Sequence, residues 1–221
     1  PWAWMRHLSR PALPAAIESL LPNGYGASME KATNNLTQKL TGIAWIAFAC
    51  FIGAALVTYD PADSLPSPMP PLDRIYQPDQ LVEPVNAAAN NACGLIGAVT
   101  ADLLLVFMGF GAHLLVATLI WLGWKRLKSI SSGSPRIQMA GWILTLLGAC
   151  GLSSLVIPHW SAGPVIGAGG YIGALEVAVL RQHFALTGAA IVLSSCFIAG
   201  VLLFVDETIL EPLRPAAALI R

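Results

Sequence analysis

Long apolar runs alternate with polar segments along this chain. Four runs of about 20 residues contain no Asp, Glu, Lys or Arg, and they lie at Leu40–Tyr59, Leu103–Trp124, Ile137–Ile157 and Phe184–Val205. At a rise of about 1.5 Å per residue, a helix of that length matches a hydrocarbon core about 30 Å thick. Lipid offers the backbone no hydrogen-bonding partners, so such runs cross a bilayer as helices. The pattern therefore predicts an all-α integral membrane protein with four transmembrane helices.

Basic residues lie mainly before the first run, between the second and third runs, and after the fourth. Only Arg74 and Arg181 lie in the other two connections. Cytoplasmic loops of membrane proteins are enriched in Lys and Arg, so both termini and the middle connection are expected in the cytoplasm. This divides the chain into a cytoplasmic extension (1–39), a membrane domain (40–205) and a cytoplasmic tail (206–221) that begins a linker.

Composition supports a membrane environment and limits the possible partners. The 221 residues are 56% hydrophobic and 11% charged, with a formal net charge of zero, whereas about 25% charged residues is usual in soluble domains. Zero net charge without a basic run argues against nucleic-acid binding by this segment. The lipid bilayer is the first partner that the composition implies.

The connection 60–92 is an acidic, proline-rich loop that we expect on the far side of the membrane. At its start, Tyr59, Asp60 and Pro61 are most simply a helix terminator, because Pro61 cannot continue a helix and Asp60 can cap the turn. A second interpretation is that these residues, with Asp63, form a motif that binds a partner protein.

The apolar stretch before the second run is too long for one crossing, and it has a counterpart later in the chain. Gly94–Ala98 (GLIGA) resembles Gly170–Ala174 (GYIGA), and a further glycine follows each segment. We interpret this as an internal repeat in which an interfacial outer helix, at about 94–106 and again at 170–182, precedes a span. Small residues allow close helix packing in lipid, either within the bundle or, for Gly109 and Gly111, at an oligomer seam. The candidate packing residues are Gly94, Gly97, Gly109, Gly111, Gly170, Gly173 and Gly188.

Few residues suggest chemistry. His113 falls in the middle of the second expected span, where an ionisable group could be an axial ligand of haem or chlorophyll, or a neutral imidazole bonded to a neighbouring helix. Asp102, Glu176 and Arg181 could form a transport site, although solvation at the outer interface explains them more simply. We expect no catalytic residue, no metal site and no cofactor.

Several segments resemble the N-terminal membrane domain of the FtsK/SpoIIIE family of bacterial DNA translocases. Val57–Ser64 (VTYDPADS) resembles the family element S-Y-D-P-x-D-x-S, and Asn91–Leu105 is similar to N-x-x-G-x-x-G-A-x-x-A-D-x-L-L. Gly169–Gly173 resembles the glycine pair that opens the family's second outer helix. The similarity covers about residues 38–205. The loop 65–90 is longer and richer in proline than the family pattern, and residues 1–28 match nothing in it.

This resemblance implies a membrane anchor and oligomerisation domain, hexameric in the family, located in the bacterial inner membrane at the division septum. It also implies contacts with other division proteins on the outer face. The family's ATPase motor requires a G-x-x-x-x-G-K-[ST] loop, which this chain lacks, so the residues shown are not expected to be an enzyme. Two other functions remain open: a structural accessory subunit of a pigment or respiratory complex, and a small transporter.

Overall fold

The computed structural model describes residues 25–66, 70, 72–74, 76, 78, 82–130, 134–160 and 167–205. Within these residues there is no β-strand, only an isolated bridge between Asp63 and Asn86, which confirms the all-α prediction. The 3-10 turn η2 covers Leu72–Arg74. The helices are α2 (Tyr25–Val57), α3 (Gly94–Met108), α4 (Gly111–Leu127), α5 (Pro135–Val156), α6 (Gly170–His183) and α7 (Leu186–Phe204).

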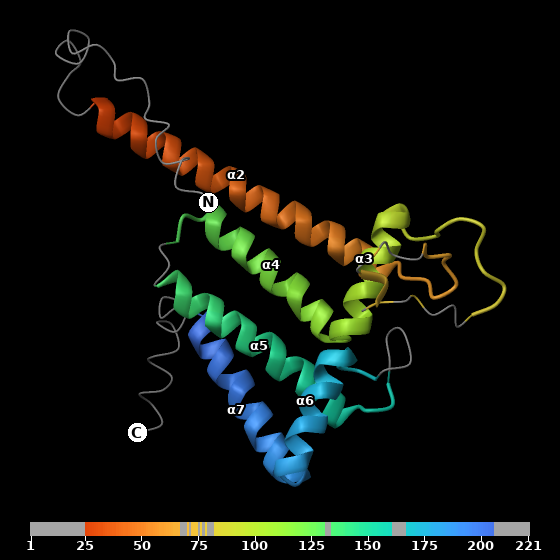
Figure 1. The fold of residues 1–221 in the computed structure, drawn as a ribbon. Coiled ribbons are helices and arrows are strands. Elements are labelled where there is room, and N and C mark those ends of the chain that lie inside the picture. The colour runs from red at the N-terminus through yellow and green to blue at the C-terminus, as the bar shows by residue number, and fades with distance from the viewer. Residues whose placement is uncertain are drawn as a thin grey trace, which may run out of the picture.

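Two similar hairpins make up the fold. In each, two long antiparallel helices are joined through a shorter helix that crosses their ends: α3 between α2 and α4, and α6 between α5 and α7 (Figure 1). The helices α3 and α6 lie at the same end of the bundle, here called the loop end (Figure 1). The start of α2, the end of α4, the start of α5 and the end of α7 lie at the opposite end (Figure 1).

Three helical segments are long and apolar enough to cross a membrane alone: Thr33–Val57, α5 and α7. A fourth crossing is possible through α3 and α4 together, but this pair is bent by 112°. The expected second span at 103–124 is therefore not one helix. Gly109, with φ of +54°, ends α3, and residues 103–108 belong to that helix. Hydropathy could not locate this bend because the residues on both sides of it are apolar.

The first helix begins earlier than expected. It starts at Tyr25, so residues 25–39, which we assigned to the cytoplasmic extension, are helical and continue directly into the first span. No proline follows Pro22 before Pro61, and proline is the residue that most strongly interrupts a helix. The rest of the expected extension, residues 1–24, and the expected tail, 206–221, lie outside the described residues.

Each hairpin is held by a pair of glycines at which two backbones approach closely. A Cβ added at Gly42 would lie 2.9 Å from the carbonyl oxygen of Gly123, and one added at Gly200 would lie 2.9 Å from that of Gly141. The first pair joins α2 to α4 and the second joins α5 to α7. None of the four glycines was among the candidate packing residues, yet Gly123 and Gly200 are separated by the same number of residues as Gly111 and Gly188.

The predicted repeat has a structural counterpart. Gly94 and Gly170 open α3 and α6 with φ of +64° and +62°, and the residues before them have nearly equal φ of −95° and −99°. The backbone N–H of Gly94 donates to Asn91 O (2.8 Å), and that of Gly170 donates to Gly167 O (3.1 Å). A positive φ is strained for any residue with a Cβ, which explains a glycine at both starts.

The candidate packing glycines serve three different purposes. A Cβ at Gly109, Gly111, Gly170 or Gly173 would overlap atoms of another helix or of the residues before α6. A Cβ at Gly97 would overlap the adjacent turn, and one at Gly188 would meet only Phe184, close by in sequence. Gly94 has open space around it, so its conformation and not its packing requires glycine. Gly109 and Gly111 pack inside the chain, which favours the internal role over an oligomer seam.

The hairpins are joined to each other by a small number of polar contacts. The indole Nε1 of Trp142 on α5 donates to Thr118 Oγ1 on α4 (2.9 Å). At the bend between α3 and α4, the Phe110 N–H donates to Ala168 O (2.7 Å). The latter bond satisfies a backbone donor at a helix start, where no intrahelical acceptor exists.

We predict that Gly200→Ala weakens the second hairpin, because its Cβ would overlap the backbone and side chain of Thr145. Overpacking of this kind costs about 1–3 kcal/mol, more than the gain of up to about 1 kcal/mol in helix propensity. Thermal unfolding in detergent should show a lower midpoint. The matched control is Gly188→Ala in the same helix, where the nearest atoms belong to Phe184 and the closest is 3.1 Å away, whereas a Cβ at Gly200 would lie closer than this to the backbone nitrogen of Thr145. Equal midpoints for the two variants would contradict the prediction.

Candidate functional site

A buried carboxyl group connects the loop 60–92 to α3. The Asp102 side chain, 5% exposed, accepts hydrogen bonds from Tyr59 Oη through Oδ1 (2.8 Å) and from Tyr76 Oη through Oδ2. Burial, reinforced by the Asp102 carboxyl, raises the pKa of both tyrosine hydroxyls, so both remain protonated donors. We call Tyr59, Tyr76 and Asp102 the loop clasp. We expected Asp102 to be solvated at an interface, but its side chain is enclosed.

The helical repeat explains why Asp102 faces inward. Ala98, Ala101 and Leu105 are also buried, and residues three and four apart share one helix face. This face packs against the end of α2, where Ala55 and Leu56 belong to the same core cluster. Asp102 thus lies on an apolar face and needs its two tyrosine partners, because an unpaired carboxyl there would be costly.

A second group of polar residues ties the start of the loop to its end. Asn86 Nδ2 donates to Asp60 Oδ2 (3.0 Å) and to Asp63 Oδ1 (2.9 Å), and the Asn90 N–H donates to Asp63 Oδ1 (2.8 Å). Asp60 Oδ1 also accepts from the Ala62 N–H (2.9 Å), which closes a local turn. Hydrogen bonds from Ala62, Asn86 and Asn90 hold the pKa of Asp60 below its usual range.

Asn91 joins the end of α2 to the start of α3. Its Nδ2 donates to Ala55 O (2.8 Å) and Thr58 O (3.2 Å), carbonyls at the end of α2. Its Oδ1 accepts from the Cys93 N–H (3.0 Å), just before α3. These bonds satisfy backbone groups that a helix terminus leaves open. From the sequence, Asn91 was identified only as part of the family motif. Its capping role could not be predicted from its position in the sequence.

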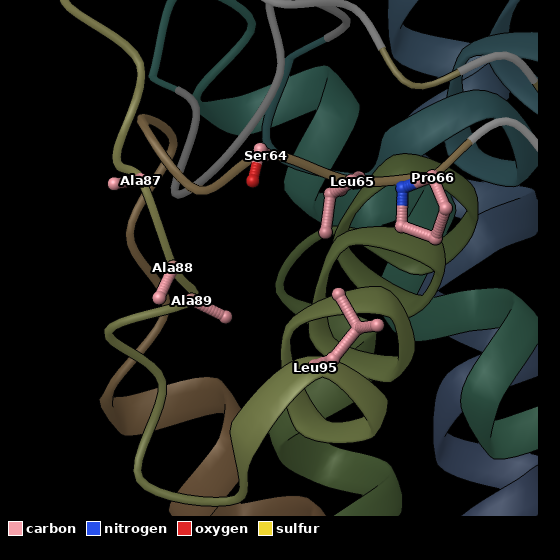
Figure 2. Close-up of a pocket in the computed structure, with 7 residues that line it drawn as sticks. All are labelled: Ser64, Leu65, Pro66, Ala87, Ala88, Ala89 and Leu95. Carbon is pink, nitrogen blue, oxygen red and sulfur yellow. The ribbon is translucent and has the colours of Figure 1, made fainter.

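An open depression of about 430 Å³ lies between the two arms of the loop and the first turn of α3 (Figure 2). Its lining contains no titratable side chain, so it offers contact and shape but no reactive group. Leu95 projects from α3 toward it and is 49% exposed (Figure 2). The lining residues are Ser64, Leu65, Pro66, Ala87, Ala88, Ala89 and Leu95.

The four motif residues at the loop start have different surroundings. Tyr59 and Asp63 are engaged in the clasp and the Asp–Asn group, and Asp63 is 5% exposed. Asp60 makes hydrogen bonds at the edge of the loop, whereas Pro61 is exposed. The motif therefore shapes the loop, and only part of it is accessible to a partner. Tyr76, which completes the clasp, was not identified from the sequence because no local pattern marks it.

His113 lies in the first turn of α4, just after the bend that divides the expected second span. Its side chain is exposed and lies beside Phe110, with ring centroids 5.5 Å apart. Among the described residues no group of three or more His, Cys, Asp or Glu is arranged to hold a metal ion.

The three residues considered for transport are not connected. Asp102 belongs to the loop clasp. Glu176 on α6 places Oε2 beside Gly151 of α5, and Arg181 is exposed near the end of α6. In the described part of the chain no hydrogen bond to the buried Glu176 Oε2 is formed. Burial raises the pKa of Glu176 to about 7, and the backbone of Gly151 acts in the opposite direction.

Two hairpins of apolar helices and a polar loop end define a helical membrane domain with three to four candidate spans. The sequence matches the family described as the 4TM region of DNA translocase FtsK/SpoIIIE over residues 34–214, and the chain belongs to this family. It is 27% identical over 162 residues to the DNA translocase FtsK of Bradyrhizobium diazoefficiens, which covers 72% of this chain and 18% of the relative. The chain thus spans less than a fifth of that protein. No solved structure matches it.

We predict that Tyr76→Phe loosens the loop, because a buried carboxyl oxygen of Asp102 would lose its donor. Leaving such an atom unsatisfied costs about 1–3 kcal/mol, and hydrogen exchange of residues 82–92 should accelerate accordingly. Tyr171→Phe is the matched control, since Tyr171 is exposed. Equal exchange rates in the two variants would show that the clasp does not hold the loop.

We predict that Glu176 makes stability depend on pH. Its pKa of about 7 exceeds the ordinary value of 4.5, so the folded protein binds this proton more tightly than the unfolded chain. The contribution is fully present below about pH 4.5 and is lost as the pH rises through about 7. Glu176→Gln should raise the unfolding midpoint at pH 8 and leave it nearly unchanged at pH 5. The exposed Glu83→Gln should give no such difference, and a pH-independent effect of Glu176→Gln would refute the assignment.

Proposed function

We propose that this chain is the membrane-anchoring and oligomerisation domain of a cell-division DNA translocase, and that it positions a cytoplasmic ATPase motor at the septum. Family membership over residues 34–214 is the observation that carries this proposal. The chain contains no phosphate-binding G-x-x-x-x-G-K-[ST] loop, so ATP hydrolysis is assigned to parts of the protein outside these residues.

The proposed topology places both termini in the cytoplasm and the loop end outside it. Four crossings are consistent with this arrangement if α3 and α4 together make one span. The distribution of charge supports it: Lys125, Arg126 and Lys128 lie at the end of α4 opposite the loop end, and cytoplasmic ends are enriched in such residues. The start of α3 and the helix α6 then lie at the outer interface.

The arrangement of side chains supports a mechanical role. The buried polar groups described above hold helices and loop together, and Asp102 uses both carboxyl oxygens to do so. Exposed apolar side chains on α2 and α7, such as Ile43 and Ile198, suit contact with lipid or with further copies in a hexamer. We assign contact with other division proteins to the accessible surface of loop 60–92, including the depression beside Leu95.

The anchoring role can be tested in the complete translocase of the source organism. We predict that exchange of residues 40–205 for an unrelated four-span bundle abolishes septal foci of a fluorescent fusion, while the protein remains in the membrane. Purified motor from the exchanged protein should keep its ATPase activity. Foci of normal intensity after the exchange would contradict the proposal.

The topology is tested separately by reporter fusions. We expect alkaline phosphatase fused after Asn86 to be active, and the same enzyme fused after Lys128 to be inactive. Phosphatase activity at both positions would contradict the proposed orientation, whatever the outcome of the exchange experiment.

A further inference from the structure

Asp63 is a buried carboxylate with one unsatisfied oxygen. Its side chain is 5% exposed, and its Oδ1 is fully engaged by Asn86 Nδ2 (2.9 Å) and the Asn90 N–H (2.8 Å). Its Oδ2 is buried and has no hydrogen-bond partner in the described part of the chain. Leaving a buried polar atom without a partner costs about 1–3 kcal/mol, and more for a charged group. Such an atom requires an explanation, and a bound water or ion is the usual one.

A second carboxylate lies beside it. Asp60 accepts a hydrogen bond from the same Asn86 nitrogen, at 3.0 Å. The other groups that contact Asp60 are the Ala62 N–H and the Asn90 amide, and all of these donors are neutral. The two carboxylates therefore share one amide donor, with no Lys or Arg among the groups that stabilise Asp60.

The surrounding loop is negatively charged. Residues 60–92 contain five acidic residues and only Arg74 as a basic one, a net charge of −4. Such a concentration of one sign attracts counter-ions of the other. The acidic residues of the loop are Asp60, Asp63, Asp73, Asp79 and Glu83.

We propose that Asp60, Asp63 and the side-chain amide of Asn86 bind a Ca²⁺ ion. Calcium takes six to eight oxygen ligands, including carboxylates, amide carbonyls and water. Asp63 Oδ2 supplies the free ligand and Asp60 the second carboxylate. The Asn86 amide gives up its two hydrogen bonds to these carboxylates and, by rotating about its last side-chain bond, presents its oxygen to the ion. With only two carboxylates, water and loop carbonyls must complete the shell, so the affinity falls near the 10⁻⁴–10⁻³ M typical of extracellular modules.

The ion would serve as a staple for the loop. Asp60 and Asp63 lie just after α2, whereas Asn86 lies shortly before α3, so one ion joins the two arms that border the depression in Figure 2. A calcium supply at this position rests on the proposed topology, in which the loop faces away from the cytoplasm. The binding chemistry itself does not depend on the septal function.

Thermal unfolding of the purified chain in detergent tests the site. After EGTA treatment, millimolar Ca²⁺ should raise the unfolding midpoint, whereas KCl of equal ionic strength should not. Asp63→Asn should abolish this rise without lowering the midpoint in EGTA, because the amide keeps an acceptor and removes the unsatisfied charge. Glu83→Gln, which removes the same charge from an exposed position in the same loop, should keep the rise.

Terbium luminescence gives a second measurement. Tb³⁺ bound near Tyr59 should be excited through its ring and displaced by Ca²⁺, with affinity at least about tenfold weaker in Asp63→Asn. Absence of a calcium response in the wild-type chain, in both the unfolding midpoint and the displacement of Tb³⁺, would overturn the proposal. Equal calcium responses in Asp63→Asn and Glu83→Gln would overturn it too. A protein that binds calcium but forms no septal foci would contradict only the anchoring role.

Discussion

Helices surrounded by lipid gain little from burying apolar side chains against each other, because the lipid tails are equally apolar. Close van der Waals contact between backbones is what remains to hold them. In this chain that contact occurs at Gly42 with Gly123 and at Gly141 with Gly200. Each pair sits toward the end opposite the loop end and fixes one hairpin.

The loop end is held by different forces. There the chain must satisfy backbone groups where helices stop, and it does so with the Asn91 amide and with Thr58, whose Oγ1 accepts from the Ala92 N–H (3.0 Å). The clasp around Asp102 adds a buried polar contact between the loop and α3. Each hairpin thus depends on close packing at one end. In the first hairpin, the opposite end depends on hydrogen bonds.

Hydropathy predicted the helical class and the apolar segments, because the bilayer imposes a length that is visible in the sequence. The matching segments at Gly94 and Gly170 also predicted two helix starts, since a positive φ requires glycine at each. The bend at Gly109 could not be predicted, because apolar residues flank it on both sides. The crossing glycines were missed although the spacing of Gly123 and Gly200 repeats that of Gly111 and Gly188. The inward position of Asp102 could not be predicted either, because its partner Tyr76 is distant in sequence and follows no periodic pattern.

The bonds that close the loop also impose an order on synthesis. Asp60 and Asp63 leave the ribosome soon after α2, yet their amide partners at Asn86 and Asn90 come more than 20 residues later. Asp102 follows later still, inside α3. The helix α2 must therefore enter the bilayer before the partners of its trailing acidic residues are made, and the loop is complete only when α3 has followed. A nascent chain paused before Asn86 would have an inserted α2 and an open loop. The carboxylates of that loop would be accessible to other molecules on the same side of the membrane.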